Sequence, residues 1–146
     1  MSQVADILAR KDSTVHTVDR ETTVFDAIKS MVEKNVGSVI VTDGESISGI
    51  LTERDYLRRI VLEGRTSRST QVSEVMTARL ICVGPSHSVE ECMSIMTQQR
   101  IRHLPVMESD RLAGIVSIGD LVKHLSKEQA SELRFLSDFV SGRYPA

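Results

Sequence analysis

Aromatic residues are scarce in this sequence. Tryptophan is absent, and phenylalanine, tyrosine and tryptophan together make up 3% of the 146 residues. Because bases are commonly held by stacking on aromatic rings, a ligand would have to be recognised mainly by backbone groups and small side chains. The core must likewise be built from aliphatic residues.

Cysteine is scarce too, and basic residues are not in surplus. Cys82 and Cys92 are too few for a disulfide framework and lack the paired spacing of a zinc site. Lysine and arginine number 18 against 20 aspartates and glutamates, so the net charge of -2 offers no surplus to neutralise a nucleic-acid backbone. We therefore expect a reducing compartment, no metal and no nucleic-acid partner.

Long apolar runs are also missing. No stretch approaches the roughly 20 apolar residues of a transmembrane helix, and Met1 to Leu8 lack the basic start and long apolar stretch of a signal peptide. We expect a cytoplasmic protein with no membrane contact, or one of an organelle matrix if a presequence has been removed. With 40% hydrophobic and 26% charged residues, the composition is that of an ordinary globular protein, and the length predicts one compact unit.

The sequence repeats itself. An offset of 65 residues aligns residues 15–61 with residues 80–126 without a gap. Just upstream, an offset of 68 aligns residues 4–7 with residues 72–75, which predicts a short lead-in turn of helix for each copy. We call the two copies the first and the second repeat.

Each repeat shows the same order of periodicities. In the first, residues 15–18 are mostly β-branched and predict a strand, and apolar residues recur at helical spacing over 24–32. Residues 39–41 and 47–51 predict a strand pair about an Asp-Gly turn, and 57–61 mark a second helix. The second repeat predicts a strand at 80–83, a helix at 89–96 opened by a capping box from Ser88 to Glu91, strands at 104–107 and 112–116, and a helix from Ser117. The predicted order is β-α-β-β-α, twice.

The repeat predicts the domain boundaries. We expect repeat 1 with its lead-in helix at residues 1–66, repeat 2 with its lead-in helix at 67–126, and a C-terminal helix and tail at 127–146. Residues 64–71 are polar and predict an exposed linker. The terminal stretch carries an apolar stripe that needs a partner, such as a second subunit. Units of about 50 residues are marginal as independent cores, so we expect the repeats to pack together.

Related motifs end the two repeats. They are Gly-Ile-Leu-Thr-Glu-Arg-Asp at 49–55 and Gly-Ile-Val-Ser-Ile-Gly-Asp at 114–120, and Arg-His-Leu-Pro-Val at 102–106 precedes the second. With the repeat order, these motifs resemble a cystathionine β-synthase (CBS) domain pair, or Bateman module, of the stand-alone, single-pair type. The resemblance implies an α/β (α+β) fold of two tandem β-α-β-β-α CBS repeats packed as one pseudo-two-fold Bateman module. It also implies a homodimer and regulatory ligands such as AMP, ADP, ATP, NAD or S-adenosylmethionine in clefts between the repeats.

The spacing within the motifs suits a nucleotide on physical grounds. The hydroxyls of Thr52 and Ser117 stand where a helix begins, and Asp55 and Asp120 follow three residues later. A helix N-terminus favours anions, and a carboxylate can accept both hydroxyls of a ribose diol. The alternative is a plain capping box. Its occurrence twice in register favours ligand binding, although capping and binding can coexist.

The resemblance places further residues at the two sites. Phosphate would lie near Arg102 and His103, whose equivalents in the first repeat are Gly37 and Ser38, so the two sites should differ. Arg54, with Arg58 and Arg59, either compensates for this loss or belongs to a solvated helix face. Adenine would lie along the first strand of each repeat, with Asp120 working with Thr17 and Val18, and Asp55 with Ile81 and Cys82. The candidate binding residues are therefore Thr17, Val18, Ser38, Thr52, Arg54, Asp55, Ile81, Cys82, Arg102, His103, Ser117 and Asp120.

Catalytic signatures are missing from the sequence. It contains no Gly-x-Ser-x-Gly, His-Glu-x-x-His or Gly-x-Gly-x-x-Gly motif. Residues 114–119 have the glycine spacing of a P-loop, but Asp120 follows where the loop needs lysine. We therefore predict a non-enzymatic sensor of adenosine nucleotides that changes conformation or dimer arrangement to modulate a partner protein. The alternative is a constitutive dimeric interaction module in which ligand binding is incidental, with thioredoxin-type redox proteins as one class of target.

Overall fold

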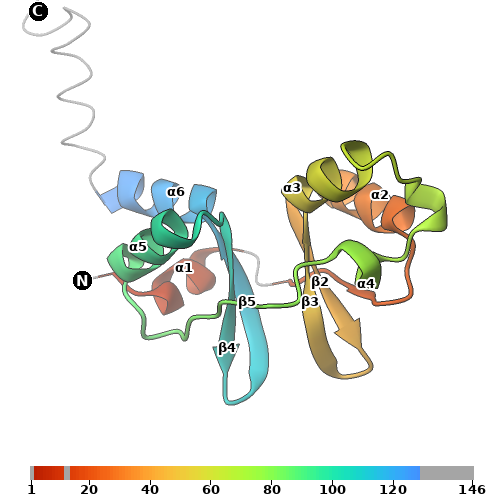
Figure 1. Ribbon diagram of the computed structural model, residues 1–146. Helices are drawn as coiled ribbons and strands as arrows, with labels where there is room; N and C mark the ends of the chain where they lie inside the picture. Colours follow the sequence, from red (N-terminus) through yellow and green to blue (C-terminus); the bar gives the residue numbers. More distant parts are fainter. Residues whose placement is uncertain (1, 12–13, 129–146) are drawn as a thin grey trace, which may run out of the picture. The chain divides into compact units, whose positions relative to one another are not determined.

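The computed structural model describes residues 2–11 and 14–128 (Figure 1). The predicted helix carrying Leu133, Leu136 and Val140 lies outside the described residues. The chain divides into two compact units, one of Thr14–Ile81 and the other of Met1–Ser13 with Cys82–Ala146. We call them the first-repeat unit and the second-repeat unit. The length alone predicts one compact unit, whereas the contacts within the chain separate two.

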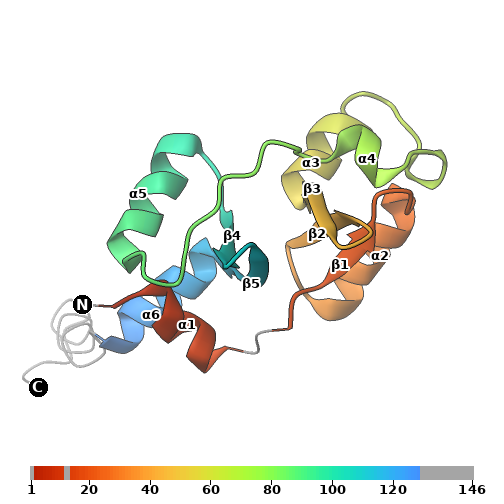
Figure 2. The same cartoon turned by 90° about the horizontal axis from the view of Figure 1, so that it is seen from below.

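The units do not follow the boundaries expected from the repeat. Helix α1 (Val4–Arg10), the lead-in of the first repeat, belongs to the second-repeat unit, where it lies beside α6 (Ile118–Glu128) (Figure 2). Helix α4 (Val72–Val75), the lead-in of the second repeat, belongs to the first-repeat unit. Each unit therefore contains one repeat together with the lead-in helix of the other.

The first-repeat unit is a three-stranded sheet with helices. Its elements are β1 (Thr17–Asp19), α2 (Val24–Lys34), β2 (Ser38–Asp43), β3 (Ser46–Thr52), α3 (Glu53–Tyr56), the π-helix η1 (Leu57–Val61), the 3₁₀-helix η2 (Ser67–Ser69) and α4. Strand β2 is central, parallel to β1 and antiparallel to β3. The core is aliphatic, as predicted, and its buried cluster consists of Val24, Ala27, Met31, Val39, Val41, Leu51, Ile60, Val72 and Val75.

The second-repeat unit contains α1, α5 (Val89–Gln99), β4 (His103–Glu108), β5 (Arg111–Ser117) and α6. Its sheet is the antiparallel pair β4–β5. Helix α5 begins with the predicted capping box, in which Glu91 N–H bonds to Ser88 Oγ at 3.0 Å and Ser88 N–H bonds to Glu91 Oε1 at 3.1 Å. The predicted order of elements is confirmed from this helix onward.

The predicted strand at 80–83 is wrong. Only Val83 pairs with β4, in a single parallel bridge to Val106. In the first repeat, Ile40 N–H donates to His16 O and extends the parallel ladder at its start. The offset of the repeat puts Pro105 in place of Ile40. Because proline has no N–H, that bond cannot form in the second repeat, and the ladder shrinks to the bonds of Val83 with Pro105 O and Met107 N.

Glycines at equivalent positions receive the exchanged lead-ins. A Cβ atom on Gly49 of β3 would lie 2.6 Å from Thr77 O and 2.8 Å from Met76 Sδ. A Cβ atom on Gly114 of β5 would lie 2.8 Å from Leu8 Cδ2. A side chain at Gly49 would therefore collide with backbone, whereas one at Gly114 would meet the end of a flexible side chain. Glycine lets both strands take a close neighbour, and it is the stricter requirement at Gly49.

The predicted exposed linker is partly held in place. The Arg68 guanidinium lies 3.9 Å from the centre of the Phe25 ring on α2, a cation–π contact. Arg65 Nη2 forms an ion pair with Glu74 Oε1 at 2.7 Å, and Thr70 is buried. Residues 65–70 thus belong to the packed surface of the first-repeat unit, although Thr66, Arg68 and Ser69 remain exposed.

Candidate functional site

Thr52 and Asp55 form a closed capping box at the end of β3. Asp55 N–H donates to Thr52 Oγ1 at 3.2 Å, and Thr52 N–H donates to Asp55 Oδ2 at 3.0 Å. Thr52 Oγ1 also bonds to Asp55 Oδ2 at 3.1 Å. Asp55 is buried, with 9% of its surface exposed. The capping alternative is therefore confirmed as the local geometry of this pair.

Asp55 has a further partner that was not identified from the sequence. Thr77, which follows α4, donates from Oγ1 to Asp55 Oδ1 at 3.0 Å. The same residue pairs with Ile50 through two backbone bonds, Ile50 N–H to Thr77 O at 3.0 Å and Thr77 N–H to Ile50 O at 2.9 Å. The three hydrogen bonds to the Asp55 carboxylate thus use both of its oxygens, and every donor is uncharged.

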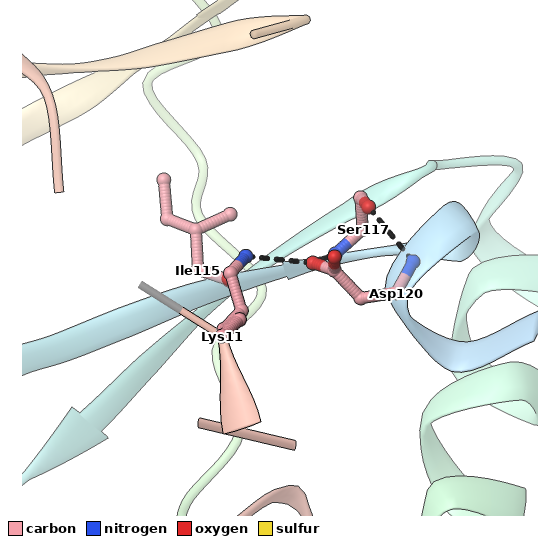
Figure 3. Close-up of polar contacts among 4 residues, drawn as sticks. All are labelled: Lys11, Ile115, Ser117 and Asp120. Atoms are coloured by element: carbon pink, nitrogen blue, oxygen red, sulfur yellow. Dashed lines mark hydrogen bonds and ion pairs between the residues drawn. The ribbon is translucent and has the colours of Figure 1, made fainter. Parts of the chain in front are cut away.

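Ser117 and Asp120 form the equivalent box at the start of α6. Ser117 N–H donates to Asp120 Oδ2 at 2.8 Å, and Asp120 N–H donates to Ser117 Oγ at 3.1 Å. The Lys11 ammonium donates to the same Oδ2 at 2.7 Å and to Ile115 O at 2.8 Å (Figure 3). Partial burial raises the pKa of Asp120, but the bonds from Lys11 and Ser117 outweigh this and hold the pKa below its ordinary value.

Lys11 makes the hydrogen bonds in the second-repeat unit that are equivalent to those of Thr77 in the first-repeat unit. Thr77 satisfies Ile50 O with its N–H and Asp55 with its hydroxyl. Lys11 bonds to Ile115 O and to Asp120, the residues equivalent to Ile50 and Asp55, with one ammonium group. Lys11 was not among the candidates drawn from the sequence. It lies more than 100 residues from Asp120, so only the tertiary structure brings the two together.

The structure also brings Arg102 and His103 to the second box. His103, the first residue of β4, lies opposite Ser117 in the strand pair, and Ile118 N–H donates to Arg102 O at 2.9 Å. Arg102 is exposed and His103 is half-buried. The backbone at Arg102, where the sequence predicts the phosphate of a ligand, is therefore hydrogen-bonded to the first turn of α6.

The first repeat has the same backbone arrangement without the cations. Ser38, the first residue of β2, lies opposite Thr52, and Glu53 N–H donates to Gly37 O at 3.2 Å. Ser38 is buried, with 7% of its surface exposed. The arginines proposed to compensate differ in their use. Arg59 and Arg54 are both exposed, and Arg59 Nη1 bonds to Val75 O and Met76 O at the end of α4.

The residues expected around adenine are found in both units. Thr17 and Val18 lie in β1, paired with Ile40 and Val41 of β2. Their predicted partnership with Asp120 joins different units and stays a prediction, as does the partnership of Asp55 with Ile81 and Cys82.

Neither cysteine has the environment of a reactive thiol. Cys82 is an exposed residue whose thiol is partly covered, and this partial burial raises the pKa of the thiol. Burial, together with the charge of Glu91, also raises the pKa of Cys92. A reactive cysteine needs the opposite shift.

Within residues 2–11 and 14–128, no three histidine, cysteine, aspartate or glutamate side chains are grouped so as to hold a metal ion. In the same residues, no helix combines the length and the apolar character needed to cross a bilayer.

Two mixed α+β units from one repeated sequence, each with a capped carboxylate after its last strand, define a tandem-repeat module. The CBS domain family matches residues 4–62 and 72–127. The chain belongs to this family, and the predicted fold class, two CBS repeats of mixed α+β structure, is confirmed.

Relatives of the chain are CBS-pair proteins. It is 44% identical over 127 residues to the mitochondrial CBS domain-containing protein CBSX3 of Arabidopsis thaliana, which covers 84% of this chain and 62% of that protein. The chain therefore spans less than two thirds of that relative. It is 37% identical over 131 residues to CBS domain-containing protein YhcV of Bacillus subtilis, covering 89% of this chain and 91% of that protein.

A solved structure is similar throughout. A protein with CBS domains from Burkholderia ambifaria MC40-6 shares 49% of its sequence with this chain, at a TM-score of 0.85 over 88% of this chain and 96% of that one. That protein and YhcV consist of little more than one CBS pair, as expected for the stand-alone type. None of these three relatives is named as an enzyme.

Proposed function

We propose that the protein is a regulatory module that binds an adenosine nucleotide (AMP, ADP, ATP or NAD) and thereby modulates a partner protein. The observation that carries this proposal is the carboxylate of Asp120, placed in the first turn of α6 beside Ser117 and next to Arg102 and His103. This cluster offers acceptors for a ribose diol and donors for phosphate within one unit.

The chemistry of the cluster matches the two ends of a nucleotide. The bonds from Lys11 and Ser117 to the Asp120 carboxylate both fall on Oδ2. Oδ1 therefore supports a proposal of diol binding, because each carboxylate oxygen can accept two hydrogen bonds. Arg102 can present a planar pair of donors to phosphate oxygens. His103 can add a third donor.

The proposal involves recognition and no chemical conversion. An enzyme acting on the nucleotide would need a general base together with a nucleophile or a metal. Asp55 and Asp120 are instead held as helix caps, and the Asp120 pKa is shifted away from neutrality. The ligand would act by favouring one arrangement of the repeats or of subunits, which requires different affinities for the two arrangements.

A second candidate function is that of a constitutive dimeric interaction module. A cavity of about 480 Å³ opens on α2, α3 and η1, and its lining includes Ile28, Val32 and Leu57. Val32 and Leu57 are 74% and 55% exposed, and Val61 and Leu62 nearby are also exposed. An apolar surface of this kind favours association with another protein surface. We propose a second copy of the chain as its occupant, with thioredoxin-type proteins as one class of modulated partner.

The test is a thermal-unfolding panel with AMP, ADP, ATP, NAD, NADH and S-adenosylmethionine. A ligand at 100 times its dissociation constant stabilises the folded state by about 2.7 kcal/mol per site. The wild type should show this shift with at least one nucleotide, and Asp120→Ala should lose it. Asp55→Ala tests the equivalent position in the first-repeat unit, and Ser88→Ala, which removes a helix cap outside the candidate binding residues, is the control for damage to a cap. A wild type that no ligand stabilises would remove the sensor proposal and leave the interaction module.

Sedimentation in the same buffers addresses the second candidate. A dimer that forms without nucleotide and dissociates in Leu57→Glu would support the apolar surface as its interface. If the chain leaves the activity of an added thioredoxin unchanged both with and without nucleotide, modulation of that class of partner is wrong.

A further inference from the structure

The ion pair between Lys11 and Asp120 sets the two repeats apart. Lys11 Nζ lies 2.7 Å from Asp120 Oδ2, and the two side chains are 33% and 24% exposed. The pair is therefore reachable from solvent, and a ligand arriving at Asp120 meets the ammonium group at the same time. In the first-repeat unit, the same place beside Asp55 is taken by the uncharged hydroxyl of Thr77.

The two carboxylates differ in what they can still accept. Asp55 receives three hydrogen bonds spread over both oxygens and is 9% exposed. The bonds of Asp120 from Lys11 and Ser117 both fall on Oδ2. A carboxylate has about four acceptor positions, so Asp120 retains more capacity for a ligand than Asp55, and that capacity lies beside a cation.

Lys11 itself retains capacity as a donor. An ammonium group has three N–H donors, and the bonds to Ile115 O and Asp120 Oδ2 use two of them. The carbonyl of Ile115 belongs to the backbone of β5, so it holds the ammonium near the start of α6 even while Asp120 changes partners. A ligand group within reach of this ammonium would gain most if it were an anion.

We propose that Lys11 is a specificity-determining residue that makes the site at Asp120 prefer phosphorylated nucleosides to the uncharged nucleoside. This inference rests on the proposed binding of adenosine compounds. A ribose diol competes with the ammonium for Asp120, and bonds between charged partners are stronger than bonds from neutral hydroxyls. Adenosine loses that competition without compensation, whereas the phosphate of AMP adds an attraction to the same ammonium.

The repeat offers a matched control for the charge. The lead-in offset of 68 aligns Lys11 with Arg79. Arg79 is exposed and belongs to the first-repeat unit. Replacing either residue by methionine removes one positive charge from the chain, but only Lys11→Met removes it from Asp120. The two variants therefore separate the local ion pair from a general change in net charge.

The experiment is calorimetric titration of the full chain with AMP and with adenosine, for the wild type, Lys11→Met, Lys11→Arg and Arg79→Met. We expect the ratio of AMP to adenosine affinity to fall about tenfold in Lys11→Met, an amount equivalent to 1.4 kcal/mol. Lys11→Arg and Arg79→Met should keep the ratio. Because both ligands are measured on one variant, a general loss of folded protein cancels from the ratio. Lys11→Gln serves as the second neutral variant if Lys11→Met does not fold.

The titrations distinguish a failure of the role of Lys11 from a failure of the proposed function. If the wild type binds AMP and the ratio is unchanged in the neutral variants, the role of Lys11 is wrong while the proposed function stands. If Arg79→Met lowers the ratio as much as Lys11→Met, long-range charge and not the ion pair is responsible, and the inference also fails. If the wild type binds neither compound, the proposed function fails and the inference falls with it.

Discussion

Replacing Gly49 or Gly114 by alanine tests the exchanged lead-ins directly. The two glycines occupy equivalent positions in β3 and β5, and neither has a positive φ angle. Alanine is therefore acceptable to both backbones. The difference between the variants lies in what the new methyl group meets.

The expected cost is larger at Gly49. The new Cβ would lie 2.6 Å from Thr77 O, a backbone atom held by the two hydrogen bonds between Ile50 and Thr77. Relieving the contact requires the backbone of residues 76–77 to move. Overpacking costs about 1–3 kcal/mol and each weakened hydrogen bond about 1 kcal/mol. We therefore expect Gly49→Ala to lower the free energy of unfolding by about 2–4 kcal/mol.

The cost at Gly114 should be smaller. The new Cβ would lie 2.8 Å from Leu8 Cδ2, the far end of a flexible side chain. Leu8 can move away without breaking a backbone bond, and alanine in a strand is favoured over glycine by about 0.5–1 kcal/mol. We therefore expect Gly114→Ala to change the free energy of unfolding by about 1 kcal/mol or less.

Urea denaturation followed by far-ultraviolet circular dichroism measures both changes, since the chain has no tryptophan to report by fluorescence. Amide hydrogen exchange adds a local readout, because Gly49→Ala should reduce protection of the Thr77 amide that bonds to Ile50 O. In a Leu8→Ala background, adding Gly114→Ala should not lower the free energy of unfolding further. Equal costs for both variants, or a larger one at Gly114, would refute the placement of the lead-ins.

Three further predictions concern charge and backbone conformation. The pKa of Asp120 in the folded protein lies below its ordinary value of 3.8, so its ion pair stabilises the fold above about pH 4 and this contribution is lost as the pH falls through the lowered pKa. Lys11→Met should therefore lose less stability than the wild type on acid titration by circular dichroism. Ser109 and Asp110 join β4 to β5 with φ angles of 51° and 63°. Asparagine and glycine adopt positive φ angles more readily, so the double variant Ser109→Asn with Asp110→Gly should raise the free energy of unfolding by about 0.5–1 kcal/mol, and with it the melting temperature. Gly44 has a φ of 63°, and a Cβ atom there would meet no other atom. Gly44→Ala should therefore lower the melting temperature, because alanine disfavours this backbone conformation. An acid profile unchanged in Lys11→Met, or a turn variant that melts below the wild type, would contradict these two arguments.

Local patterns determined much of the fold and part of the site. The boxes at Ser88–Glu91, Thr52–Asp55 and Ser117–Asp120 depend on residues three apart in the chain, and all three form in the structure. The β-α-β-β-α order also follows from local periodicity. The missing strand at 80–83 had a signal in the sequence, because Pro105 has no N–H to offer a parallel neighbour.

Tertiary structure decided the rest. The sequence itself shows that each repeat has a lead-in helix, but contacts between distant segments place α1 with the second repeat and α4 with the first. The same contacts bring Lys11 to Asp120 and Thr77 to Asp55, so two equivalent capping boxes have partners of different charge. A capping box depends on backbone geometry within one helical turn and can be read from spacing. An ion pair across more than 100 residues depends on how packed surfaces meet, and no spacing in the chain encodes that.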